Sequence, residues 1–308
     1  MILVTGAGGF IGKRLCTHLR AAEFDVIPLY HAEKAEFHDD WWALDLTRTD
    51  HLALLKANTS APDTVIHLAG CVSIALQASP GDPASAPLPG KEDVARIYRV
   101  NVGATANVLD YCLHIGVRHL IFASSQAIYG MPQTEILTED SPCVPIEHYA
   151  ASKLCCEFLL QIGAHQGLSV TVLRFPGVFD EGRKSGIVYS YCQMAISSKR
   201  IRVTNDFPLP FDVIHLDDVV DGLGRSVRYR GQHWTCLNLA YGEPCNVNLL
   251  ADAVAELVPG CQVEHSKVPQ PVVQMDVRRA IAALGWRAQS RRKRLASMLE
   301  TVRNADRT

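Results

Sequence analysis

The first twelve residues contain the feature that most restricts the fold of this chain. An apolar run at residues 1–5 leads directly into a segment with glycines at positions 6, 9 and 12. Apolar residues then recur at helical spacing through residues 10–21. Gly6 permits a tight turn, Gly9 lets the backbone approach a ligand, and Gly12 lets a helix pack closely on a strand. A strand, turn and helix of this kind directs free N–H groups at an anion, which predicts a phosphate site.

Strand-like and helix-like segments alternate over most of the chain. The expected strands are residues 1–5, 25–30, 41–44, 64–68, 119–123 and 169–174, and the expected helices are 10–21, 48–57, 93–115 and 149–165. This alternation predicts an α/β protein with a doubly wound parallel sheet, a Rossmann fold covered by helices on both faces. After about residue 175 the segments shorten, with helices expected near 188–198 and 216–229 and strands near 201–203 and 211–214. They predict a smaller C-terminal lobe interleaved with the last elements of the sheet.

The net charge and the composition restrict the kinds of partner and the compartment that we expect for this protein. Thirty basic and 32 acidic side chains give a net charge of −2, which argues against nucleic acid or an anionic membrane surface as a partner. No signal-peptide pattern and no long apolar stretch is present, so we expect a cytoplasmic protein. The ten cysteines lack C-x-x-C spacing and are expected to be buried thiols in a reducing compartment. The basic run at 291–294 is expected to be a solvated helix face.

Further motifs follow the glycine segment in a fixed order. They are TGAGGFIG at 5–12, Asp45-Leu46, VIHLAG at 65–70, Asn101, FASSQAIYG at 122–130, YAASK at 149–153, LRFPGVF at 173–179, FDVIHLDDV at 211–219 and LGWR at 284–287. In this order they resemble the extended short-chain dehydrogenase/reductase superfamily, specifically its nucleotide-sugar epimerase/dehydratase branch. The resemblance covers nearly the whole chain. It implies an NAD(P)-binding Rossmann domain at 1–174, with later sheet elements from about 211–240, and a mainly substrate-binding lobe at 175–308.

Tyr149 and Lys153 are the strongest candidates for catalysis. Four residues apart on a helix, they share one face. A phenol with a pKa near 10 is a poor base at neutral pH, but an adjacent ammonium and an oxidised nicotinamide would favour the phenolate. The resemblance implies that Tyr149 is the general acid/base, that Lys153 lowers its pKa and binds the nicotinamide ribose, and that Ser125 orients the substrate oxygen. Asn101 would support this site from the neighbouring helix.

The choice between NAD and NADP depends on the end of the second strand. An acidic residue there would bind the ribose hydroxyls of NAD, and an arginine would accept the 2′-phosphate of NADP. The chain has Tyr30-His31, followed by Glu33 and Lys34, so we expect NAD(P) with a slight preference for NAD. Asp45 matches the residue that contacts the adenine amino group in the family. The full expected cofactor set is Gly6, Gly9, Phe10, Ile11, Gly12, Tyr30, His31, Asp45, Leu46, Leu68, Ala69, Gly70, Asn101, Tyr149, Lys153 and Phe175.

Departures from the family pattern concern the substrate. Gln126-Ala127 stand where sugar-nucleotide dehydratases carry an Asp-Glu pair, so water elimination lacks its usual proton carriers. Phe211 replaces the arginine that grips the substrate diphosphate, and Gly177 replaces an asparagine. The expected substrate contacts are Ser125, Gln126, Gly177 and Phe211. Nearby cations that could compensate are Arg174, Arg183, Lys184 and Arg202.

The leading hypothesis is an NAD(P)-dependent sugar-modifying enzyme, most consistent with a nucleotide-sugar epimerase. Net oxidation or reduction of a sugar or another small hydroxy or carbonyl compound stays open, and a non-catalytic dinucleotide-binding protein is a remote alternative. No metal is expected, because His67 and His215 fit core positions better than ligand positions. Asp217-Asp218 fit a helix N-terminus. The proline-rich residues 79–90 fit either a lid or a passive loop.

Self-association is also expected. The resemblance implies a homodimer in which the helices that carry Asn101 and Tyr149 pack into a four-helix bundle. An apolar stripe on the second of these helices could serve this contact or could equally be buried within the monomer. The stripe consists of Leu154, Phe158, Leu159 and Ile162.

Overall fold

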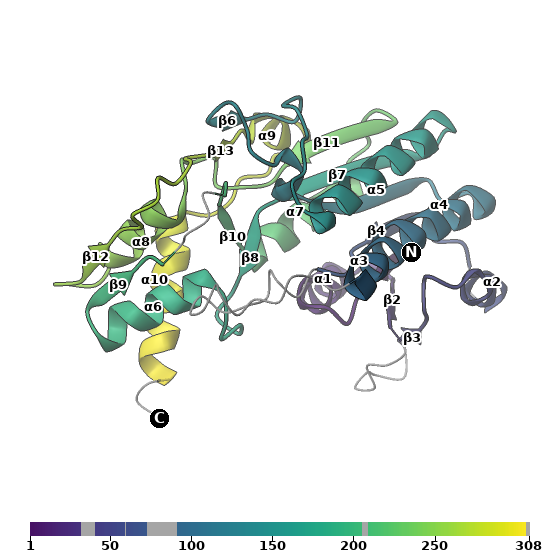
Figure 1. The fold of residues 1–308 in the computed structure, drawn as a ribbon. Coiled ribbons are helices and arrows are strands. Elements are labelled where there is room, and N and C mark those ends of the chain that lie inside the picture. The colour runs from purple at the N-terminus through teal and green to yellow at the C-terminus, as the bar shows by residue number, and fades with distance from the viewer. Residues whose placement is uncertain (32–40, 59, 73–90, 205–208, 306–308) are drawn as a thin grey trace.

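The computed structural model describes residues 1–31, 41–58, 60–72, 91–204 and 209–305 (Figure 1). Its centre is a seven-stranded parallel sheet in the order β11-β7-β5-β4-β1-β2-β3. The strands are β1 (Ile2–Thr5), β2 (Val26–Tyr30), β3 (Trp42–Ala43), β4 (Thr64–His67), β5 (His119–Ser125), β7 (Ser169–Phe175) and β11 (Trp234–Asn238). The strand order reverses at β1, which lies between β2 and β4. This topology confirms the predicted doubly wound sheet, and a reversal of this kind is where such folds bind ligands.

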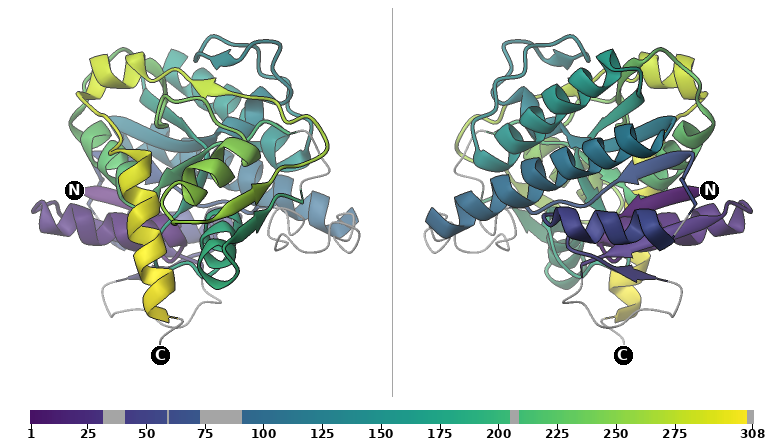
Figure 2. Two further views of the ribbon diagram at one scale, coloured as in Figure 1. Left: turned by 90° about the vertical axis from the view of Figure 1, so that its left-hand side faces the viewer. Right: turned by 90° about the vertical axis from the view of Figure 1, so that its right-hand side faces the viewer.

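Helices cover both faces of the sheet. On one face α1 (Phe10–Ala21), α7 (Leu216–Arg228) and α9 (Arg278–Leu284) share an apolar core with β1, β5, β7 and β11. On the other face α2 (Thr49–Asn58), α4 (Ala104–Ile115) and α5 (His148–His165) lie side by side over a second core (Figure 2). Successive residues of these strands are apolar because both faces of the sheet are buried against helices.

The predicted helix at 93–115 is interrupted. It consists of α3 (Lys91–Tyr98), a π-helical turn at Arg99–Gly103, and α4. A π turn widens the helix by one residue, and such turns occur frequently at functional sites. Apolar periodicity does not reveal this turn, since the pattern continues on both sides of it. Asn101 lies within the turn and is buried.

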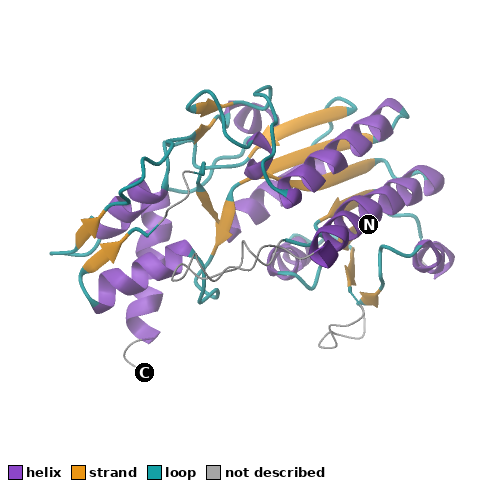
Figure 3. Ribbon diagram, in the orientation of Figure 1, coloured by secondary structure: helices purple, strands orange, loops and turns teal. Residues whose placement is uncertain are grey.

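The C-terminal part forms a separate lobe with its own apolar core (Figure 3). It contains α6 (Ile187–Ser197), α8 (Val247–Ala255) and α10 (Arg291–Ala305), together with the parallel pairs β8 (Gly177–Phe179) with β10 (Val213–His215) and β9 (Arg200–Arg202) with β12 (Gln262–Glu264). A small third pair joins β6 (Ile136–Leu137) to β13 (Gln274–Met275). Later elements of the central sheet were expected from residues 211–240. In the structure β11 joins this sheet, whereas β10 pairs with β8 outside it.

The basic run at 291–294 is only in part the solvated helix face that was expected, since Arg292 and Lys293 are exposed but Arg291 and Arg294 are held by other groups of the protein. Arg291 is only 6% exposed, donates to the carbonyls of Glu243 and Pro244, and lies 3.5 Å from Asp212 Oδ1. Arg294 forms ion pairs with Asp217 and Asp218. The prediction was wrong for Arg291 and Arg294, because charge density along a sequence does not show which acidic groups the fold brings near a basic side chain.

Other expectations have mixed outcomes. His67 and His215 are buried, as expected, and His215 rather than an aspartate caps α7 by accepting the N–H of Asp217. All ten cysteines are free thiols, but only half are buried and Cys155 is exposed. None of the helices in the described ranges is both long and apolar enough to cross a membrane. Glu33, Lys34 and the loop at 79–90 lie outside the described residues.

Candidate active site

The glycine turn lies between β1 and α1, at the carboxyl edge of the sheet. Gly6 has φ +67°, and a Cβ atom there would lie 2.7 Å from the backbone nitrogen of Ala69 at the end of β4. The turn is closed by the Gly9 N–H, which donates to Gly6 O at 2.9 Å. Gly9 is also the N-cap of α1 and makes no side-chain cap bond. The first-turn N–H groups of α1 therefore remain available to an anion.

An open cleft of about 1030 Å³ extends from this turn across the edge of the sheet. Nine residues of the expected cofactor set line it, namely Gly6, Gly9, Tyr30, His31, Asp45, Leu46, Leu68, Ala69 and Gly70. Gly12 lies beneath the turn, Phe10 is exposed beside it, and Phe175 is buried in the core. Arg96 and Arg99 also line the cleft, and sequence reasoning missed them. The volume of the cleft, the close backbone approach and the glycine turn all fit a dinucleotide.

Asp45 forms one wall of this cleft. The backbone N–H and the hydroxyl of Thr47 donate to Asp45 Oδ1 at 2.9 and 2.8 Å. Partial burial raises the pKa of Asp45, but the two bonds from Thr47 outweigh this effect, and the pKa lies below its ordinary value. Asp45 is thus an oriented carboxylate, as contact with an amino group requires.

Ser125, Tyr149 and Lys153 come together next to the cleft. Ser125 ends β5 and hydrogen-bonds the Tyr149 side chain, and Lys153 Nζ lies 5.9 Å from the centre of the Tyr149 ring. Burial, with a smaller contribution from Glu147, raises the pKa of Tyr149 to about 12, while the Ser125 bond lowers it. Lys153 is buried, which lowers its pKa, and it donates to Ala123 O at 2.9 Å. The chain's own groups therefore hold Tyr149 as a neutral phenol.

Asn101 connects this group to the cofactor cleft. Its Oδ1 accepts the N–H of Cys71 at 2.6 Å, and its Nδ2 donates to Cys71 O and to Ser152 Oγ. Ser152 in turn donates to Tyr149 O at 2.7 Å. The π turn thus holds the segment after β4 and the start of α5 in one arrangement.

His67 extends the same framework inward. Its Nδ1 lies 2.7 Å from Thr5 Oγ1, and its Nε2 lies 3.0 Å from Thr105 Oγ1. The Thr105 hydroxyl donates to Asn101 O, so it accepts from Nε2, and Nδ1 accepts from Thr5. Burial, with a contribution from the charge of Lys153, lowers the pKa of His67 to about 3. His67 is therefore a neutral connector between the glycine turn and the π turn.

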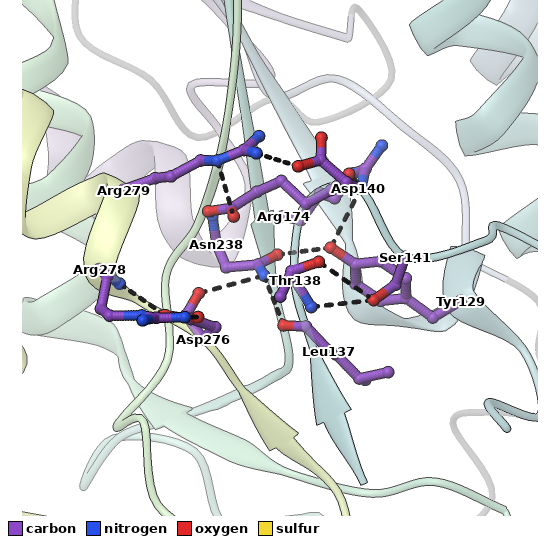
Figure 4. A network of polar contacts seen from close by, with 11 residues as sticks. Tyr129, Leu137, Thr138, Asp140, Ser141, Arg174, Asn238, Asp276, Arg278 and Arg279 are labelled. Atoms are coloured by element: carbon purple, nitrogen blue, oxygen red, sulfur yellow. Dashed lines mark hydrogen bonds and ion pairs between the residues drawn. The ribbon is translucent and has the colours of Figure 1, made fainter. Parts of the chain in front are cut away.

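Arg174 belongs to a buried network and cannot compensate for the missing diphosphate arginine. It forms two hydrogen bonds to Glu157, at 2.6 and 3.1 Å, and donates to Tyr129 Oη and Glu139 O. Figure 4 shows the Tyr129 hydroxyl hydrogen-bonded to both Arg174 and Asn238. Glu157 also accepts from Ser124, the neighbour of Ser125. Sequence reasoning missed Glu157. The available signal was its position four residues after Lys153, which places both side chains on the same face of the helix.

The other expected substrate contacts lie in different environments. Phe211 is half-buried against the core of the second lobe, and Gly177 is exposed. The Arg202 guanidinium is paired with Glu264 at 3.0 Å. The exposed cations left from the expected set are Arg183, whose guanidinium lies 5.5 Å from the centre of the Phe10 ring, and Lys184. Gln126 is buried beside Ser125, and its Nε2 has no hydrogen-bond partner among the described residues.

The sheet topology, the glycine turn at its edge and the Ser-Tyr-Lys group define a dinucleotide-dependent enzyme of the extended short-chain dehydrogenase/reductase type. A model of the NAD dependent epimerase/dehydratase family matches residues 2–239. The chain belongs to this family, and it is an NAD(P)-dependent epimerase or oxidoreductase.

Known proteins resemble the chain over nearly its whole length. It is 26% identical to a UDP-glucose 4-epimerase of Azospirillum brasilense, over 92% of this chain and 86% of the relative. It is 25% identical to a dTDP-4-dehydro-6-deoxyglucose reductase of Escherichia coli, over 93% and 92%. Among solved structures, MoeE5 in complex with UDP-glucuronic acid and NAD has a TM-score of 0.74 at 27% identity, with 99% of each chain covered.

Proposed function

We propose that this protein is a nucleotide-sugar epimerase that works by transient hydride transfer. The observation that carries the proposal is the grouping of Ser125, Tyr149 and Lys153 at the end of β5, beside a cleft that fits a dinucleotide. Curated relatives of similar length include UDP-glucose 4-epimerases. Their substrate class is the one we propose for this chain.

In this mechanism Ser125 and Tyr149 hydrogen-bond one sugar oxygen. Tyr149 removes the hydroxyl proton as the carbon is oxidised and returns it after the keto sugar has turned over. The bound dinucleotide supplies reversible hydride acceptance and a positive charge near the phenol. Lys153 adds its ammonium charge, and because Ala123 O uses one of its three N–H donors, two are left for a ribose. The Gln126 Nε2 amide group, which has no hydrogen-bond partner in the part of the chain that the structure describes, would donate to a second substrate oxygen.

A direct assay tests this proposal. UDP-glucose and UDP-galactose should interconvert in the presence of NAD, without net accumulation of reduced nicotinamide. Tyr149→Phe should lower the rate by about 100-fold or more, because general acid–base catalysis contributes on this order. Tyr229→Phe, at the end of α7, is the matched control and should leave the rate unchanged. If Tyr149→Phe retains full activity, both the catalytic assignment and the proposed function are wrong.

A second candidate is a reductase or dehydrogenase of a smaller sugar or carbonyl compound. Phe211 in place of an arginine, together with the engagement of Arg174 by Glu157, leaves few cations for a substrate diphosphate. One relative is a reductase of a nucleotide-linked deoxysugar. Steady consumption or production of reduced nicotinamide with substrate would select this candidate over the epimerase.

The proposal includes a preference for NAD over NADP. Tyr30 and His31 line the cleft at the end of β2, where an enzyme that selects NADP would carry an arginine. Mass spectrometry of the cofactor that co-purifies with the protein tests this preference. Recovery of NADP alone would contradict it.

We further propose that the protein is a cytoplasmic homodimer. Its ten free thiols suit a reducing compartment. Of the apolar stripe on α5, Phe158 is 58% and Ile162 55% exposed, whereas Leu154 and Leu159 pack against the protein's own core. Phe158 and Ile162 are therefore the residues available to a partner helix. Light scattering at micromolar concentration tests the dimer.

A further inference from the structure

Three polar side chains form a row across the carboxyl edge of the central sheet. Ser124, Arg174 and Asn238 come from β5, β7 and β11, and the strand register pairs Arg174 with each of the other two. All three are buried. Buried polar groups cost free energy unless they are hydrogen-bonded, so this row needs partners from outside the three strands.

Glu157 on α5 is the partner of two members of the row. Arg174 donates to Glu157 Oε2 at 2.6 Å and to Oε1 at 3.1 Å, and the Ser124 hydroxyl also donates to Oε1. Bidentate bonds between a guanidinium and a carboxylate fix the relative geometry of the two groups. Lys153, one turn before Glu157, donates to Ala123 O at 2.9 Å. The helix therefore holds the end of β5 at two successive residues.

Tyr129 anchors the other end of the segment that follows this strand. Its hydroxyl donates to Asn238 Oδ1 at 2.7 Å and accepts from Arg174 Nη1 at 3.1 Å (Figure 4). The 3-10 turn at Gln126–Tyr129 begins directly after Ser125. Arg174 therefore holds this short segment at both ends, at one end through its carboxylate partner on α5 and at the other end directly.

We propose that the Glu157–Arg174 ion pair positions Ser125 for catalysis. It holds the segment 124–129 at both ends, so that the Ser125 hydroxyl meets the Tyr149 phenol and the same substrate oxygen. Glu157 and Arg174 are positioning residues, which act on the reaction through Ser125. The inference rests on the proposed function, in which Ser125 and Tyr149 hydrogen-bond one sugar oxygen.

Two variants each detach one end of the segment and leave the ion pair in place. Ser124→Ala removes the hydroxyl that donates to the Glu157 carboxylate. Tyr129→Phe removes the hydroxyl that lies between Arg174 and Asn238 but keeps the buried ring. Glu157→Gln addresses the ion pair directly, and the two hydroxyl variants keep the test decisive if Glu157→Gln does not fold.

The matched controls remove a hydroxyl from buried side chains elsewhere. Ser226→Ala on α7 is the control for Ser124→Ala, and Tyr191→Phe on α6 is the control for Tyr129→Phe. Each variant and each control is also made in a second background that carries Ser125→Ala. Urea unfolding establishes that every protein is folded under the assay conditions.

The first readout is the epimerisation of UDP-glucose with NAD. Ser124→Ala and Tyr129→Phe should each lower kcat by about 10-fold or more, because a misplacement of about 1 Å can cost about 100-fold. NAD binding, measured by titration calorimetry, should be unchanged. In the Ser125→Ala background the same substitutions should have no further effect on kcat, because changes that act through one residue are not additive. A general loosening of the fold would lower kcat in both backgrounds.

The second readout needs no turnover. With NAD bound, the tyrosinate absorbance of Tyr149 is followed against pH, as the difference between each variant and the same variant carrying Tyr149→Phe. The hydrogen bond from Ser125 lowers the pKa of this phenol. Ser125→Ala, Ser124→Ala and Tyr129→Phe should therefore each move the transition to higher pH, and the last two should add nothing in the Ser125→Ala background.

An unchanged kcat and an unchanged tyrosinate transition in either hydroxyl variant would overturn the inference. Effects of equal size in the Ser125→Ala background, or in the controls, would do the same. Full activity of Tyr149→Phe would instead overturn the proposed function. If the wild type does not turn over UDP-glucose, the tyrosinate titration decides the role of the ion pair by itself, so the two failures are distinguishable.

Discussion

Gly12 offers the sharpest test of how the glycine turn is built. A Cβ atom at this position would lie 2.2 Å from Gly6 O, 2.7 Å from Ala7 Cα and 2.8 Å from Ala7 O. Ordinary van der Waals contact begins at 3.4 Å, so the methyl group of Gly12→Ala would overlap backbone by more than 1 Å. The turn has no room to retreat, because on its other side Gly6 lies against Ala69. Either α1 or the turn must move.

The cost follows from two opposing effects. Alanine is preferred over glycine in a helix by about 1 kcal/mol. Overpacking of a rigid site costs about 1–3 kcal/mol and here falls on backbone atoms, which have no alternative rotamers. With the overpacking cost in the upper part of this range, about 2–3 kcal/mol, we expect a net loss of about 1–2 kcal/mol in the free energy of unfolding. Displacement of the anion-binding turn by about 1 Å should weaken NAD binding by about 10- to 100-fold.

Titration calorimetry with NAD and urea unfolding measure both effects. Gly103→Ala is the matched control, since a Cβ there has no heavy atom within 4 Å and the residue is already helical, with φ −62° and ψ −47°. It should bind NAD like the wild type and be as stable or slightly more stable. Wild-type affinity and an unchanged unfolding midpoint in Gly12→Ala would refute the reasoning.

Three further predictions concern the framework and the surface. Glu157→Leu leaves Arg174 buried without its ion-pair partner and should lower the free energy of unfolding by about 3–5 kcal/mol; an unchanged urea midpoint would contradict this. The pKa of His67 is about 3 in the native state and near 6.5 when unfolded. Neutral His67 therefore contributes its full stabilisation of the folded state above pH 6.5, and this contribution declines as the pH falls, because the unfolded chain gains a proton that the folded protein does not. The free energy of unfolding should fall by about 2 kcal/mol between pH 7 and 5 from this cause, and its pH dependence should be weaker in His67→Asn. Phe158→Asp should turn the proposed dimer into a monomer, as measured by light scattering, whereas a dimer of unchanged mass would exclude this face of α5.

Local sequence patterns predicted the helices and strands of the central sheet closely. Residues 10–21 were expected to be helical and form α1 with the same limits, and residues 64–68 were expected as a strand and contain β4. The short strands β6, β12 and β13 were not predicted, because strands of two or three residues carry too little alternation to detect, whereas β9 was expected near 201–203 and lies at Arg200–Arg202. The π turn at Arg99–Gly103 was also missed, since one extra residue per turn leaves the apolar pattern nearly intact.

The candidate site residues also divide into those that the sequence predicted and those that only the structure revealed. The grouping of Ser125, Tyr149 and Lys153 was predicted from motifs, because their positions at a strand end and on one helix face follow from the chain itself. Glu157 was not predicted, because a glutamate on a helix carries no mark of burial or of its partner. Arg174 was considered as a substrate contact, yet its neighbours in space, Glu157 and Tyr129, occupy its guanidinium.

The sequence by itself determined the parallel sheet, the glycine turn and the positions of the proposed acid/base residues, since each depends on residues close together in the chain. The tertiary structure alone decided which charges are satisfied. Arg291 is buried beside Asp212, 79 residues away, and Arg294 pairs with Asp217 and Asp218. Whether a charged side chain faces solvent, a ligand or an ion partner depends on burial and on groups distant in sequence, because desolvation and Coulomb energies act through space and not along the chain.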